Sequence, residues 1–309
     1  MRFVDIKSDI AFKKVFGNEN KREILISFIN AVLGLQGEKE IGDITILNPY
    51  QAPRLAELKE TTLDIRAVNK EGVTFIIEIQ VQKKVGFEKR ILYYTSKAYV
   101  GQLEKGDEYL KLNQVIFIGV MDFEIFEGNN YLTRHLILNT STYKQEIKDI
   151  ELYFIELPKF QKTEEELQTV KEKWIFFIKN ADNLKMIPKS ADFRQLQEAY
   201  DMADKMIWSK EELDIYDYWL MKEQDARGAI EYSFFEGEKE GEKKGLIKGK
   251  QEGLIEGIEA LLELKYGRYG IALIDKVKLL DTIEKLEILK NLIKTSNTIE
   301  MIEEYLCRK

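Results

Sequence analysis

The chain has 309 residues, of which 44% are hydrophobic and 33% charged, a composition that can build ordinary globular cores and suggests two domains. Its formal net charge of -7 argues against a protein that coats polyanions over its whole surface. His135 and Cys307 are the sole histidine and the sole cysteine, which excludes an internal disulfide, a zinc site built from His or Cys, and a Ser-His triad.

The sequence contains no run of about 18 or more uncharged apolar residues, and charges occur throughout its start, MRFVDIKSDIAFKKVF. We therefore expect no membrane span, no signal peptide, no membrane partner and a cytoplasmic location. Any catalysis must rest on carboxylates, Lys, Arg, Tyr or Ser. Carboxylates without His or Cys favour hard cations such as Mg²⁺.

Residues 1–160 have the pattern of a compact α/β domain. Apolar residues at helical spacing predict two short helices over 9–35, and FEKRILYYTSKAYVGQLEKG predicts a longer helix that ends at Gly106. Strand-like segments rich in Ile, Val, Phe and Tyr lie around that helix: ITILNP, TLDIRAVN, VTFIIEIQVQ, QVIFIGVMDF, RHLILNT and IELYFIELPKF. This order predicts a mixed sheet flanked by helices.

Residues 161–309 predict helices only. A helical region over 161–235 begins with Thr163 and Glu166 in a capping-box arrangement. Residues 236–265 form a glycine-repeat segment, in which every fourth residue from 237 to 257 is glycine, and residues 266–309 form a last amphipathic helical segment.

The glycine repeat is costly if it is helical, because Gly costs about 1 kcal/mol relative to Ala and six of them roughly 5 kcal/mol. One interpretation is a helix that self-associates or docks a partner helix through its glycine stripe. The other is a solvated, partly frayed linker.

Two apolar strands each carry one carboxylate. If Lys70-Glu71-Gly72 is a three-residue hairpin loop with Gly72 in the left-handed conformation, Asp64 lies opposite Glu78. Side chains alternate along a strand, so Glu78 and Gln80 point to the same face as Asp64.

A divalent cation would resolve the repulsion between these carboxylates. Mg²⁺ or Mn²⁺ would take oxygens from Asp64, Glu78 and the Ile79 backbone carbonyl, and would lower the pKa of a bound water. The alternative interpretation places both carboxylates on a solvated sheet face, paired with Arg66 or with lysines.

The ordered set of motifs resembles the PD-(D/E)XK nuclease superfamily, and more specifically the Rpn family of recombination-promoting nucleases and transposase-like proteins. The segments that carry this resemblance extend over nearly the whole chain and include the glycine-repeat tail: SDIAFKKVFG, ELKETTLDIRA, IIEIQV, FEKRILYYTSKAY, GDEYLKLNQVIFIGVMDF and IELPKF.

The resemblance implies a restriction-endonuclease-like fold and a Mg²⁺-dependent endonuclease that cleaves DNA in recombination, transposition or defence against foreign DNA. Carried over by position, Asp64 and Glu78 would be metal ligands, while Gln80 stands where the superfamily usually has lysine. Asp9 is a candidate outer carboxylate, or else a helix N-cap.

The missing lysine leaves the source of positive charge open, because a neutral amide can orient a water but supplies no charge. Lys13, Arg90 and Lys97 are candidates. Arg90, Tyr93 and Lys97 share one helical face at positions i, i+3 and i+7 and could approach the site together. The second functional hypothesis is a catalytically weak or inactive nuclease-fold module that binds DNA and assembles through its helical tail.

Overall fold

A computed structural model describes residues 2–48, 50, 51 and 61–307 of the chain. It divides into two compact units, Met1–Met221 and Lys222–Lys309. The first part of the predicted motif ELKETTLDIRA lies outside the described residues. Among the described helices, none is long and apolar enough to cross a membrane.

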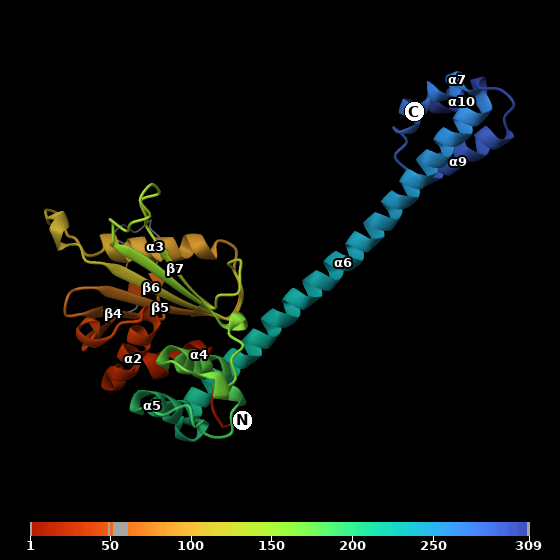
Figure 1. Cartoon of the computed structure of the whole chain (residues 1–309). Helices are drawn as coiled ribbons and strands as arrows, with labels where there is room; N and C mark the ends of the chain where they lie inside the picture. The colour runs from red at the N-terminus through yellow and green to blue at the C-terminus, as the bar shows by residue number, and fades with distance from the viewer. Residues whose placement is uncertain (1, 49, 52–60, 308–309) are drawn as a thin grey trace. The chain divides into compact units, whose positions relative to one another are not determined.

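The first unit is built on a mixed sheet with helices on both faces (Figure 1). Within the described residues the sheet has six strands in the order β1-β4-β5-β6-β8-β7. Strands β5, β6 and β8 run parallel, and β1, β4 and β7 pair antiparallel with their neighbours. The strands are β1 Ile44–Leu47, β4 Ile65–Asn69, β5 Thr74–Gln80, β6 Val115–Met121, β7 Leu132–Leu136 and β8 Ile150–Glu156, with a separate pair β2 Tyr50–Gln51 and β3 Thr61–Thr62.

The predicted hairpin between β4 and β5 is confirmed in its register. Ile65 pairs with Ile77, and the Asn69 N–H donates to the Val73 carbonyl at 3.1 Å. Gly72 has a φ of +83°, the left-handed conformation that the three-residue loop requires. Continuing this register by one residue places Asp64 opposite Glu78.

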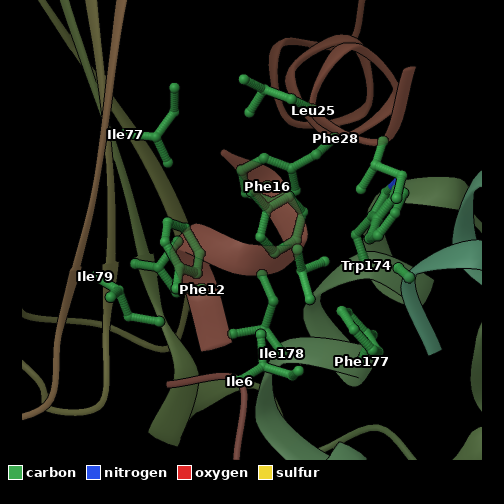
Figure 2. Close-up of a cluster of buried hydrophobic side chains, with 14 of the residues drawn as sticks. Ile6, Phe12, Phe16, Leu25, Phe28, Ile77, Ile79, Trp174, Phe177 and Ile178 are labelled. Atoms are coloured by element: carbon green, nitrogen blue, oxygen red, sulfur yellow. The ribbon is translucent and has the colours of Figure 1, made fainter. Parts of the chain in front are cut away.

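Apolar residues on both faces of β5 fix the direction of Glu78. Figure 2 shows Ile77 and Ile79 on one side of the strand, facing Phe12 in the larger of two buried clusters in this unit. Ile76 belongs to the second cluster, on the opposite face. A slip of one residue would turn the charge of Glu78 into the larger cluster, so the apolar side chains strongly specify this register.

The helices of the first unit divide between the two faces of the sheet. Helix α3 covers one face, and α1, α2, α4 and α5 supply side chains to the larger cluster on the other (Figure 1). In that cluster the Phe16 ring lies 5.1 Å from that of Phe28 and 5.6 Å from that of Trp174, between centroids. These helices are α1 Asp9–Phe16, α2 Arg22–Leu33, α3 Phe87–Val100, α4 Val170–Asn180 and α5 Arg194–Ala203.

The helical region expected after residue 160 packs into the same core as the sheet, because Trp174 and Tyr200 belong to the larger cluster. The first compact unit consequently extends to Met221, and the predicted boundaries at 160, 235 and 265 do not coincide with its limit. The capping box of Thr163 and Glu166 is present, but it begins a short 3-10 turn, and α4 starts at Val170.

The second unit contains most of helix α6, Lys210–Tyr266, and a small bundle at its C-terminal end. Ile258 and Leu262 of α6 are buried there against Leu286, Leu289 and their neighbours. The bundle helices are α7 Arg268–Ile271, α8 Ile274–Val277, α9 Ile283–Thr295 and α10 Glu300–Cys307. The glycine repeat lies within α6 and is helical throughout.

The described residues also contain short 3-10 helical segments. They are Glu19–Lys21, Gly37–Lys39, Tyr109–Lys111, Leu157–Lys159, Glu164–Glu166, Ala181–Asn183 and Lys205–Ile207.

Candidate active site

Asp64 and Glu78 meet where β4 begins beside β5. The Asp64 N–H donates to Glu78 Oε1 at 3.3 Å, and the Ile79 N–H donates to Asp64 Oδ2 at 2.8 Å. Glu78 is 5% exposed, and the Asp64 side chain is 14% exposed. The alternative interpretation, a solvated sheet face, is therefore wrong for Glu78.

The position at which β4 begins determines what the Ile79 peptide group can bind. Peptide groups alternate along a strand, and the Gln80 carbonyl already faces β6, where it accepts from the Asp122 N–H at 2.9 Å. The Ile79 peptide therefore points to the other side, where β4 has not yet begun, because its first residue Ile65 pairs with Ile77. Asp64 accepts its N–H there, and Gln80 Nε2 donates to its carbonyl at 2.8 Å.

Helix α1 brings one acidic and one basic side chain to the carboxylates. Lys13 Nζ lies 2.7 Å from Asp9 Oδ1 and 3.6 Å from Asp64 Oδ1. Burial lowers the pKa of Lys13, but Asp9 and Asp64 outweigh this effect and raise it, so the ammonium stays charged. The N-cap of α1 is Ser8, which accepts from the Ala11 N–H, so the alternative reading of Asp9 as the cap is wrong.

Both carboxylates of the pair hold protons more tightly than exposed ones do. Burial raises the pKa of Asp64, the Ile79 N–H opposes that rise, and Asp9 adds to it. Burial also raises the pKa of Glu78, followed by the charge of Asp64, while the charge of Arg90 lowers it. Burial and mutual repulsion thus disfavour two charged carboxylates here, and a bound cation would offset both effects.

Helix α3 contributes a guanidinium from the other side of the site. Arg90 Nη2 donates to Gln80 Oε1 at 2.6 Å, and the guanidinium carbon lies 5.9 Å from the centre of the Tyr94 ring. Burial raises the pKa of Tyr94, and the charges of Glu78 and Asp64 add to that rise against the effect of Arg90. The Tyr94 phenol is therefore within electrostatic reach of both carboxylates.

Tyr93 and Lys97 lie further along the same helix. The Tyr93 side chain is 39% exposed, and its ring centre lies 6.4 Å from that of Tyr94. Lys97 is partly exposed and follows Arg90 by seven residues, about 10 Å along a helix axis. The roles predicted for Tyr93 and Lys97 stay predictions.

The sequence predicts Tyr93 as a site residue but not Tyr94, whose ring lies beside Arg90. The signal was present, because Arg90 and Tyr94 are spaced i and i+4, the separation at which helical side chains meet. The approach of Lys13 and Asp9 could not be derived from local spacing, since α1 precedes Asp64 by about 50 residues in the printed sequence.

The arrangement offers two buried carboxylates to a cation. Among the described residues, no group of three or more His, Cys, Asp or Glu side chains is arranged as a metal site. The assignment of Asp64, Glu78, Asp9 and the Ile79 carbonyl as metal ligands therefore stays a prediction. A magnesium ion commonly uses one or two protein carboxylates and keeps several waters, which this donor set can satisfy.

No curated protein and no solved structure matches the chain. A model of the family described as PD-(D/E)XK nuclease family transposase matches residues 6–233. The match covers most of the first unit, and its mixed sheet with flanking helices is restriction-endonuclease-like. The chain therefore belongs to the PD-(D/E)XK nuclease family of transposases.

Proposed function

We propose that this protein is a metal-dependent DNA endonuclease that hydrolyses phosphodiester bonds in the cytoplasm, in recombination, transposition or defence against foreign DNA. Within its family we place it with the Rpn-like group, on the motifs that suggested this resemblance. One observation carries the proposal: Asp64 and Glu78 lie together, largely buried, at the start of β4, where the Asp64 N–H donates to Glu78 and the Ile79 N–H donates to Asp64. Burying two carboxylates costs free energy, so such a pair indicates a bound ion or a catalytic role.

The donor set fits a hard divalent cation, because both side chains are carboxylates with pKa values raised by burial. Asp64 and Glu78 would hold Mg²⁺ or Mn²⁺, with the Ile79 carbonyl as a third protein oxygen once the Gln80 amide releases it. When bound, the cation neutralises phosphate charge and makes a water molecule more acidic.

The other side chains supply charge and orientation. Arg90 fixes Gln80 through its hydrogen bond, so the guanidinium stands close to where the superfamily lysine would be. Lys13 adds a second positive charge from α1. Their donors can stabilise the negative charge that develops on the phosphate during cleavage.

A plasmid-nicking assay with Mg²⁺ or Mn²⁺ tests this proposal. Asp64→Asn and Glu78→Gln keep the side-chain shape and one acceptor oxygen but lose the charge, so both should abolish cleavage. The exposed Glu108→Gln is the matched control and should cleave as wild type does. Cleavage by both amide variants at the wild-type rate would overturn the assignment.

The second candidate is a DNA-binding module with weak or no cleavage. The observation that favours it is the neutral Gln80, whose amide is engaged at both ends, with Arg90 and with the Ile79 carbonyl. Wild-type protein that binds DNA yet leaves plasmid intact with either cation would support this candidate over the first.

For the tail we propose that the glycine repeat is a surface for another helix, either in a second copy or in a partner. A Cβ added at Gly241, Gly245 or Gly249 would meet no atom within 4 Å other than the adjacent backbone of its own helix, so no contact in the structure explains these glycines. Changing Gly245, Gly249 and Gly253 to Ala should lower the oligomer mass measured by light scattering. An unchanged mass would rule out self-association through the stripe.

A further inference from the structure

A cavity of about 540 Å³ opens at the start of α3, beside the candidate active site. That volume falls in the range of about 300–1,000 Å³ in which small molecules bind. Its lining consists of cationic and aromatic side chains and the loop that leads into the helix: Lys84, Val85, Gly86, Phe87, Lys89, Arg90, Tyr93 and Tyr94.

Two residues of the lining, Arg90 and Tyr94, connect the cavity to the carboxylate pair. Arg90 lines the cavity and also donates to Gln80, which lies two residues after Glu78 on β5. Tyr94 lines the cavity too, and the charges of Glu78 and Asp64 act on its phenol. A ligand in the cavity would therefore lie next to a phosphate bound at the carboxylates.

The lining has the chemistry of a nucleotide-binding surface. Lys84 and Lys89 are exposed and can contact phosphates, and Tyr93 presents a ring that is 39% exposed. Val85 is fully exposed beside them. Cations that track a phosphate backbone and rings that stack on bases are the two components of single-strand recognition.

A continuous duplex could use only the first of these components. Its bases are stacked inside the helix, so their faces are hidden from Tyr93. An unpaired nucleotide can turn its base out and stack it on an aromatic side chain.

We infer that this cavity holds one unstacked nucleotide of the substrate strand, adjacent to the phosphodiester that is cleaved. The protein then prefers DNA with single-stranded or unpaired nucleotides over a continuous duplex. The inference rests on the proposed function, since it takes DNA as the substrate and places the cleaved bond at Asp64 and Glu78.

Equilibrium binding in EDTA tests the inference without cleavage. Fluorescence anisotropy of the full-length chain is measured with three labelled probes of equal length: a single strand, a blunt duplex, and a duplex with one unpaired nucleotide. The single strand and the interrupted duplex should bind more tightly than the blunt duplex. Tyr93→Ala should weaken binding of these two probes by about 5-fold or more, the lower end for loss of one base stack.

Three matched variants separate stacking from other effects. Tyr93→Phe keeps the ring and should bind as wild type does. Tyr109→Ala removes another exposed tyrosine, outside the cavity, and should change nothing. Lys89→Ala should weaken binding of all three probes alike and reduce the salt dependence by about one phosphate contact.

The outcomes also separate this inference from the proposed function. Equal binding of the three probes, or unchanged single-strand binding by Tyr93→Ala, overturns the nucleotide cavity while plasmid cleavage can still stand. Wild-type protein that neither binds nor cleaves any DNA overturns both.

Discussion

Replacing Glu78 by glutamine should make the metal-free protein more stable, although the change removes a candidate ligand. Glu78 is 5% exposed, and burial together with the charge of Asp64 raises its pKa. Glutamine has the same shape, and its Oε1 can still accept from the Asp64 N–H. Each unit by which the pKa rises on folding corresponds to about 1.4 kcal/mol, so the gain at mildly alkaline pH should be at least about 1.4 kcal/mol.

The sign of this effect depends on pH. The folded protein keeps a proton on Glu78 that the unfolded chain releases near its ordinary pKa of 4.5. The free energy of unfolding of wild type therefore falls as pH rises from that value through the higher pKa of the folded state. Wild type and Glu78→Gln should be equally stable in acid and should diverge as the pH increases.

Urea unfolding in EDTA across this pH range measures the difference, with Glu108→Gln as the control. Adding Mg²⁺ at ten times its dissociation constant should then stabilise wild type by about 1.4 kcal/mol and leave Glu78→Gln unchanged. Equal stability of wild type and variant at alkaline pH without metal would refute the electrostatic reasoning. Equal stabilisation of both by Mg²⁺ would place the cation elsewhere.

Three further changes test the hairpin, a helix start and the guanidinium. Gly72→Ala should destabilise the protein by about 1–2 kcal/mol in urea unfolding, because φ is +83° and the new Cβ would meet Asn113 Nδ2 at 2.7 Å; Gly42→Ala, in open space, should be close to neutral. Burial opposes ionisation of Glu172, but Lys162 and two backbone N–H groups lower its pKa to about 2. Glu172→Gln should therefore be less stable than wild type at neutral pH, and the difference in the free energy of unfolding should disappear as the pH falls toward 2. Arg90→Ala should reduce the rate of plasmid nicking roughly 100-fold while a thermal melt shows the fold intact, and an undiminished rate would remove the guanidinium from the mechanism.

The elements that set the carboxylate pair could be predicted because their causes are local. Gly72 fixes the turn, the turn fixes the register, and the alternation of β5 fixes the face of Glu78. The turn, the register and the face of Glu78 do not depend on contacts from outside the hairpin. For the same reason the strand-like segments overlap the observed strands, although RHLILNT is shifted toward the C-terminus relative to β7, Leu132–Leu136.

The extent of the first unit was harder to predict because it depends on tertiary packing. Trp174 and Tyr200 sit in helices whose spacing shows an apolar face but not what that face packs against. Only the structure shows that Phe16 of α1 packs against Trp174. The helices after residue 160 therefore complete the core on this face of the sheet.

At position 80 the chain has glutamine where the superfamily usually has lysine, and this changes which residue brings positive charge to the carboxylates. A lysine there would bring its own charge to the carboxylates on a flexible stem. Gln80 instead joins the Ile79 carbonyl to Arg90, so the positive charge comes from α3 and is held by a planar group with several donors.

Binding of a cation that needs the Ile79 carbonyl would free the Gln80 amide and loosen its hold on Arg90. Cation binding and the position of the guanidinium would therefore be coupled through one side chain. Gln80→Ala tests this coupling. It should leave Arg90 without its anchor and weaken cleavage more than cation binding, whereas an equal loss of both would show that Gln80 acts only on the cation.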